Sequence, residues 1–140
     1  MTQDFSKKMT IIVREDVVSW QLTNTVAHIA AYLANKMTES FDTGKYFTSQ
    51  DGVDFPRNSQ YGIVALKATN AEIKELALKA KESKMLWIVY VQEMIDMIDD
   101  VELGNALKTK KFNDMNILGI GFFGPKEELK SLTGKLKLWK

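Results

Sequence analysis

The chain has 140 residues, which is long enough to bury one hydrophobic core, and we expect a single domain over residues 1–140. The 45% hydrophobic and 26% charged residues are typical of a globular protein, and no apolar run approaches the roughly 20 residues that cross a bilayer. The net charge of +1 disfavours a protein that binds mainly to phosphates, and the absence of cysteine excludes disulfides and thiolate chemistry. We expect a cytoplasmic protein with no membrane contact.

The first third of the chain predicts a strand, a helix and a long loop. Residues 9–13 are a β-branched run bounded by charges, and Ser19 stands where a helix N-cap belongs. Apolar residues then recur at helical spacing at Leu22, Val26, Ile29, Ala30, Leu33 and Met37. Residues 38–60 show no periodicity, but Asp51-Gly52 predicts a small hairpin. Turn chemistry explains Asp51 better than calcium binding does.

The rest of the chain alternates strands and helices. We expect a strand over 61–68, a helix capped by Asn70, a central strand over 86–91 and mostly helix over 93–111, with buried candidates at Met94, Ile95, Ile98, Val101 and Leu107. A strand over 117–123 precedes a short helix that opens at Gly124-Pro125 and ends at Gly134. Residues 135–139 could add a short edge strand. This order predicts an α/β fold: a three-layer α/β/α sandwich with a small mixed β-sheet.

Gly119, Gly121 and Gly124 spell the G-x-G-x-x-G pattern of dinucleotide sites. Only 16 residues follow Gly124, which is too few for the next strand and its acidic ribose ligand. Close packing of the sheet against a helix is the better explanation. We therefore expect no cofactor, and a single histidine without cysteine predicts no metal site.

The first helix carries a second, polar line beside its apolar face. Gln21, Thr25, His28 and Tyr32 gather about 120° from the apolar stripe, at 100° per residue. His28 is the only histidine of the chain. These side chains could line a cleft, or they could bond to one another and to neighbouring loops while covering the sheet.

Three segments together resemble the type II peptidyl-tRNA hydrolases. They are KMTIIVREDVV, TVAHIAAYL and the closing NILGIGFFGPKEELKSLTGKLKLWK. The order of elements agrees along most of the chain, so the resemblance implies that family's compact α/β sandwich, commonly as a homodimer.

The catalytic signature of those hydrolases differs here. They place a lysine seven residues before the helix histidine and a glutamine three before it, where this chain has Gln21 and Thr25. Their Asp-Ala-Gly-Arg-Thr segment has no counterpart, and Glu93 lies nearest to the place of its aspartate. The chain is more similar to an uncharacterised sister family with a W-Q-x-x-N-x-x-A-H helix start, which Trp20, Gln21, Asn24 and His28 match, and a D-G loop.

Two functions follow as hypotheses. The first is a hydrolase of a small ester or amide, with His28 and Gln21 as catalytic residues and with Trp20, Asn24, Thr25 and Glu93 around the substrate. The second is a non-catalytic module that binds a small molecule or a peptide on the same fold. Binding of tRNA through lysines at 108–111 and at the C-terminus is a third, less favoured candidate, and it would weaken steeply with salt.

Overall fold

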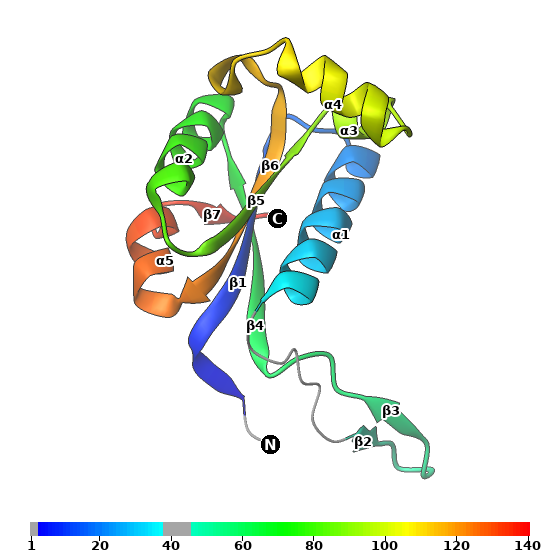
Figure 1. Cartoon of the computed structure of the whole chain (residues 1–140). Coiled ribbons are helices and arrows are strands. Elements are labelled where there is room, and N and C mark those ends of the chain that lie inside the picture. The colour runs from blue at the N-terminus through cyan, green and yellow to red at the C-terminus, as the bar shows by residue number, and fades with distance from the viewer. Residues whose placement is uncertain (1–2, 38–45) are drawn as a thin grey trace.

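A mixed five-stranded sheet forms the centre of the computed structural model, which describes residues 3–37 and 46–140. The strand order is β5-β6-β1-β4-β7. β1 runs parallel to β4, and β6 runs antiparallel to both β1 and β5. Hence β1, β4 and β5 all point the same way, and helices cover both faces of the sheet (Figure 1).

The elements follow the predicted order. The strands of the sheet are β1 (Asp4–Arg14), β4 (Tyr61–Ala68), β5 (Leu86–Val91), β6 (Ile117–Pro125) and β7 (Lys137–Leu138). The helices are α1 (Ser19–Lys36), α2 (Asn70–Glu82), α3 (Glu93–Asp96), α4 (Asp100–Lys108) and α5 (Lys126–Thr133), with a short 3₁₀ turn at Phe112–Asp114. A separate hairpin of β2 (Tyr46–Thr48) and β3 (Asp54–Pro56) completes the list.

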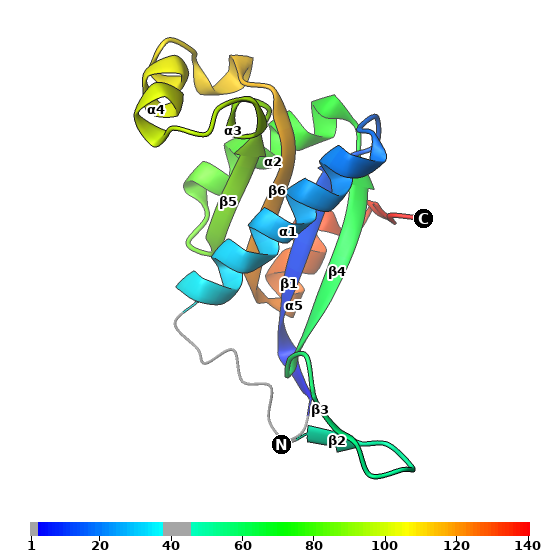
Figure 2. The ribbon, with the colours of Figure 1, turned by 90° about the vertical axis from the view of Figure 1, so that its right-hand side faces the viewer.

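Two apolar clusters hold the layers together, one on each face of the sheet. Side chains alternate along β1, so Met9, Ile11 and Val13 face α1 whereas Ile12 faces α2 and α5. Ile29 and Leu33 of α1 are fully buried in the first cluster, and Ile73 of α2 and Leu129 of α5 are fully buried in the second. α1 thus lies diagonally across one face (Figure 2).

The glycines of β6 bring α1 close to the sheet, as predicted. A Cβ atom on Gly121 would lie 2.2 Å from Cγ2 of Ile29, and one on Gly119 would lie 2.6 Å from Cγ2 of Thr25. Gly124 has the same relation to Met85, at 2.7 Å. These positions exclude larger residues for reasons of packing, which confirms the structural explanation of the glycine pattern.

Several details of the expectation were wrong. Helix α1 has Val18 rather than Ser19 as N-cap, and α2 is capped by Thr69, whose Oγ1 accepts from the N–H of Glu72 at 3.2 Å, rather than by Asn70. β5 is an edge strand, not a central one. The helical segment over 93–111 breaks at residues 97–99, as α3 ends at Asp96 and α4 begins at Asp100. This break leaves Ile98 and Val101 exposed instead of buried.

The hairpin predicted at Asp51-Gly52 is confirmed. The N–H of Gly52 donates to the carbonyl of Ser49 at 3.0 Å, and Gly52 has a φ of 87°, which favours glycine. The part of the predicted loop at 38–45 lies outside the described residues. None of the helices in the described part of the chain is long and apolar enough to span a membrane.

Candidate functional site

The carboxyl ends of β1 and β5 meet the start of α1 at one edge of the sheet. Open α/β sheets bind ligands outside the carboxyl ends of their parallel strands, so this edge is the first place to look for a site. Polar side chains gather here from segments far apart in the sequence: Arg14, Asp16, Gln21, Gln92, Asp96 and Asn116.

Gln21 is the centre of a chain of amide hydrogen bonds at this edge. Its Nε2 donates to Oε1 of Gln92 at 3.0 Å, and Nε2 of Gln92 donates to Oδ1 of Asp96 at 2.9 Å. Oε1 of Gln21 accepts the backbone N–H of Val18 at 3.1 Å. Gln21 therefore both closes the first turn of α1 and ties that helix to the segment after β5.

Arg14 organises the neighbouring part of the edge. Its Nε and Nη2 donate to the two carboxylate oxygens of Asp16, at 2.8 and 3.1 Å, and its Nη1 donates to Oδ1 of Asn116. The hydrogen bond from Arg14 lowers the pKa of Asp16; burial opposes this effect and the charge of Arg14 adds to it. The guanidinium charge is thus matched by a carboxylate within the site.

His28 lies further along α1, where a hydrogen bond fixes its tautomer. Its Nδ1 lies 2.9 Å from the backbone carbonyl oxygen of Asn24, one helical turn earlier. A carbonyl oxygen can only accept, so Nδ1 carries the proton and the neutral ring has its lone pair on Nε2. The imidazole is exposed and stacks on the ring of Tyr90, with centroids 4.9 Å apart and an interplanar angle of 17°.

Asn24 joins the histidine to the sheet. Its Oδ1 accepts from the hydroxyl of Tyr90 at 3.0 Å, and burial raises the pKa of that hydroxyl, so it stays a donor. No described residue accepts from Nδ2 of Asn24. One turn of α1 therefore carries a hydrogen-bond donor on Asn24 and a hydrogen-bond acceptor on His28.

The structure brings together only some of the predicted site residues. Thr25 is fully buried beneath α1, where its methyl group faces Gly119, so a ligand on the exposed surface of the helix would not touch it. Trp20 is 55% exposed on the first turn of the helix. Tyr32 lies one turn beyond His28 and is 36% exposed.

Glu93 is buried, but it faces a cation rather than His28. Its Oε1 forms an ion pair with Nζ of Lys110, two residues beyond the end of α4, and its Oε2 has no partner among the described residues. Burial acts to raise the pKa of Glu93, but the hydrogen bond from Lys110, a backbone hydrogen bond and the charge of Lys110 together lower that pKa. Glu93 is therefore a carboxylate at neutral pH.

Sequence reasoning missed Gln92, Asp96 and Asn116 as members of this site, and it noted Arg14 and Asp16 only as part of the resemblance. One signal was available. Arg14 and Gln92 end or follow parallel strands, where functional side chains of α/β proteins gather.

His28 and Tyr32 of the polar line on α1 are exposed to solvent, whereas Thr25 is buried. The β2–β3 hairpin does not cover them, because it points away from α1 (Figure 2). A hollow of about 570 Å³ lies near the other end of α1, next to Met37. Within residues 3–37 and 46–140, no three histidine, aspartate or glutamate side chains gather in a way that could hold a metal ion.

Comparisons with known proteins give a family and a fold. The model of the family described as "Protein of unknown function (DUF2000)" matches residues 7–140. The solved structure of the protein of unknown function Atu0240 from Agrobacterium tumefaciens strain C58 is similar, with a TM-score of 0.82 and 18% identity over 98% of this chain and 100% of that one. No match was found among curated proteins. The chain thus belongs to the DUF2000 family of proteins of unknown function.

Proposed function

We propose that this protein is a hydrolase of a small ester or amide, with His28 as general base on the exposed face of α1. The observation that carries the proposal is the hydrogen bond from Nδ1 of His28 to the carbonyl of Asn24. This bond leaves Nε2 as the basic atom of an exposed ring, which is the state that a general base needs. Tyr90 supports the ring from one side.

The reaction follows from the groups beside Nε2. A water molecule donates a hydrogen bond to Nε2 of His28, and Nδ2 of Asn24 donates to the carbonyl oxygen of the substrate. The water oxygen attacks the carbonyl carbon while its proton passes to Nε2, and the imidazolium then gives that proton to the leaving oxygen or nitrogen. Trp20 supplies an apolar wall for the substrate.

Gln21 acts in this proposal as a positioning residue. It holds the first turn of α1 against Gln92 and Asp96, and so fixes the helix that carries Asn24 and His28. Glu93 contributes through its ion pair with Lys110, which anchors the segment after α4 at this edge. The resemblance to type II peptidyl-tRNA hydrolases supports ester or amide hydrolysis, a sandwich fold of their kind and a homodimer. The loss of their lysine at Gln21 favours a small substrate over tRNA.

A second candidate is a binding module without chemistry. The observation that favours it is that Gln21, Gln92 and Asp96 form hydrogen bonds to one another, which is typical of side chains with a structural role. In that case the donor of Asn24 and the acceptor of His28 would bind a carboxamide, which offers the complementary pair of groups.

The test compares the wild type with His28→Gln on a panel of p-nitrophenyl esters, amino-acid anilides and peptidyl-tRNA, the last with a type II hydrolase as positive control. Loss of a general base should lower the rate about 100-fold or more, with an unchanged melting temperature. Asn35→Ala, on the exposed last turn of α1, is the matched control and should keep the full rate.

The outcomes separate the two candidates. Turnover that His28→Gln retains would overturn the general-base role. If no substrate is turned over, but a carboxamide raises the melting temperature of the wild type and not that of Asn24→Ala, the protein is a binding module. If neither turnover nor such binding occurs, both candidates fall.

A further inference from the structure

The β2–β3 hairpin forms an arm that projects from the body of the molecule at the start of β4 (Figures 1 and 2). Its two strands pair only with each other, and all six strand residues are exposed. Phe47 and Phe55 lie opposite each other on one face, with ring centroids 5.8 Å apart. We call residues 46–56 the arm.

The apolar side chains of the arm are largely exposed to solvent. Tyr46, Phe47 and Phe55 are 67%, 52% and 48% exposed, and Val53 is 58% exposed. With about 200 Å² for each aromatic side chain, Phe47 and Phe55 leave roughly 200 Å² open to water on one face of the arm. Tyr46 leaves a further area of more than about 100 Å² on the other face, since it pairs with Pro56. A lone two-stranded hairpin is marginally stable in water, so exposed aromatic rings on both of its faces are consistent with an arm that packs against a partner.

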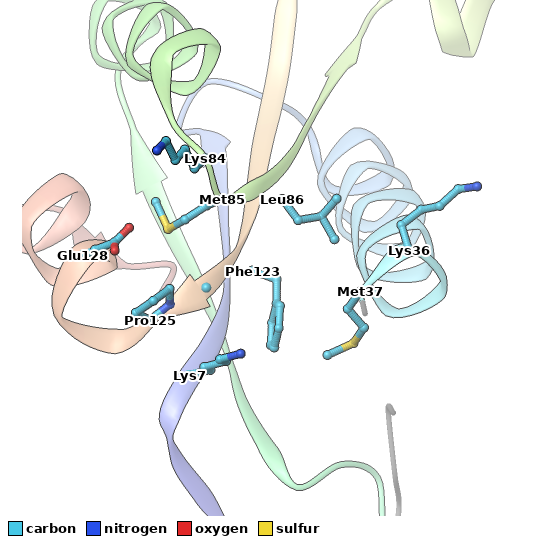
Figure 3. A pocket seen from close by; sticks show the side chains of 10 residues that line it. Lys7, Lys36, Met37, Lys84, Met85, Leu86, Phe123, Pro125 and Glu128 are labelled. Atoms are coloured by element: carbon cyan, nitrogen blue, oxygen red, sulfur yellow. The ribbon is translucent and has the colours of Figure 1, made fainter. Parts of the chain in front are cut away.

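A hollow of about 570 Å³ lies at the same end of the sheet, between the end of α1 and the start of α5. Its floor is apolar and consists of Met37, Met85, Leu86 and Phe123, beside Gly124 and Pro125. Figure 3 shows Phe123 at the centre, with Lys84 and Lys7 on either side of it and Lys36 on α1 beyond. Glu128 is the one acidic residue of the lining.

The arm and the hollow are complementary in both polarity and charge. The only charged residues of the arm are Asp51 and Asp54, which give it a charge of −2. Three lysines and one glutamate give the lining of the hollow a charge of +2. The aromatic rings of an arm would cover the apolar floor, and its aspartates would face the lysines of the rim.

We propose that the hollow receives the arm of a second copy of this chain. The arm points away from its own body, so a partner must supply the arm that fills each hollow (Figure 1). Because both features lie at one end of the molecule, a two-fold axis there makes the contact reciprocal, with two arms in two hollows and a closed dimer. If each hollow encloses both faces of the arm, the aromatic contacts of two arms and two hollows bury roughly 1,200 Å², the lower bound of a specific interface.

This inference does not depend on the proposed hydrolase activity, because it uses none of the residues around His28. The primary test is an exchange of charges. One variant carries Lys36→Glu and Lys84→Glu, which makes the hollow negative, and the other carries Asp51→Lys and Asp54→Lys, which makes the arm positive. In each variant alone, arm and hollow have the same sign. In a 1:1 mixture, every arm again meets a hollow of opposite sign.

Sedimentation equilibrium measures the molecular mass of each protein in solution. The wild type should have twice the monomer mass of 15.9 kDa, each variant alone should be a folded monomer by circular dichroism, and the mixture should recover the dimer. A wild-type monomer at 100 μM, or variants that both remain dimers, would overturn the proposal. So would a mixture of folded variants that stays monomeric.

Disulfide cross-linking gives a second test that leaves Asp51 and Asp54 in place. Their hydrogen bonds with Ser49 and Thr48 are therefore kept. The chain has no cysteine, so single cysteines can be placed without background. Val53→Cys on the arm, mixed with Lys36→Cys at the hollow, should form an intermolecular disulfide on mild oxidation. Lys108→Cys, exposed on α4, is the control partner. Equal cross-linking to Lys36→Cys and Lys108→Cys would show a non-specific encounter and refute the docking.

Discussion

The contact between α1 and the sheet at Gly121 positions the candidate site, and Gly121→Ala tests it directly. The new Cβ would lie 2.2 Å from Cγ2 of Ile29 and 3.0 Å from Cδ1 of Leu33, and both side chains are fully buried. Neither neighbour can swing into solvent, so α1 must move away from β6. Overpacking of this kind costs about 1–3 kcal/mol, and we expect the upper half of that range.

Urea unfolding followed by tryptophan fluorescence measures this loss. A destabilisation of about 2–3 kcal/mol should lower the melting temperature by roughly 5–10 °C in a domain of this size. Gly62→Ala is the matched control, because a Cβ on Gly62 of β4 would have nothing within 4 Å. The control should leave the free energy of unfolding unchanged within about 0.5 kcal/mol.

A double-mutant cycle decides whether Ile29 causes the loss. Ile29→Ala alone creates a cavity and should cost about 2–5 kcal/mol, but it also removes the methyl group that blocks the new Cβ. The double variant with Gly121→Ala and Ile29→Ala should therefore lose less free energy of unfolding than the two single variants together, by at least about 1 kcal/mol. Strict additivity, or a Gly121→Ala protein as stable as Gly62→Ala, would refute this account of how α1 is seated.

Three further predictions concern charge and protonation. Lys110→Met leaves the buried carboxylate of Glu93 unpaired, so it should cost about 1–2 kcal/mol at pH 7. Because Lys110 lowers the pKa of Glu93, the pKa of Glu93 should be higher in Lys110→Met than in the wild type. The difference in free energy of unfolding between the two proteins should therefore shrink as the pH falls and Glu93 takes up a proton. A difference that does not depend on pH would contradict this. In a tag-free protein, His28 gives the only imidazole signals, and its ¹⁵N chemical shifts at alkaline pH should show the proton on Nδ1. A proton on Nε2 would remove the basis of the general-base role. In filter binding at low salt, we expect no tRNA retention, and binding that weakens steeply with added salt would revive that partner.

The sequence predicted the strands well where they are bounded by clear signals. The run 61–68 lies between polar segments and is β4 from end to end. The residues of β5 do not alternate between apolar and polar, and this pattern predicts a central strand. Helices on both faces of a sheet produce the same pattern in an edge strand, which is what β5 is. The cap of α2 could have been read correctly, since Thr69 with Glu72 three residues later is a capping box.

The line of site residues on α1 was predicted in part. The apolar stripe was centred on the mean of six positions, among them Val26 and Ala30, which are only partly buried. The three fully buried residues are Thr25, Ile29 and Leu33, so the true centre is rotated by about 50° toward Thr25. This rotation buries Thr25 and leaves Gln21 and His28 at the flank. The partners Gln92 and Asn116 are more than 70 residues distant in the chain, and only the sheet topology brings them to the site.

The balance of charge at this edge argues that a lysine at position 21 would not be enough to bring tRNA chemistry to this protein. Arg14 is paired with Asp16, and Glu93 with Lys110, which leaves Asp96 as an additional negative charge close to Gln21. Gln92 links position 21 to Asp96 by hydrogen bonds, so we expect the ammonium group of a lysine at position 21 to pair with the carboxylate of Asp96. That pairing would neutralise the lysine and weaken its attraction for a phosphate. We expect Gln21→Lys to gain no peptidyl-tRNA cleavage, whereas Gln21→Lys with Asp96→Asn should gain salt-sensitive tRNA binding. Cleavage of peptidyl-tRNA by Gln21→Lys alone, measured under single-turnover conditions, would show that one cation suffices and that the surrounding carboxylates are screened from the substrate.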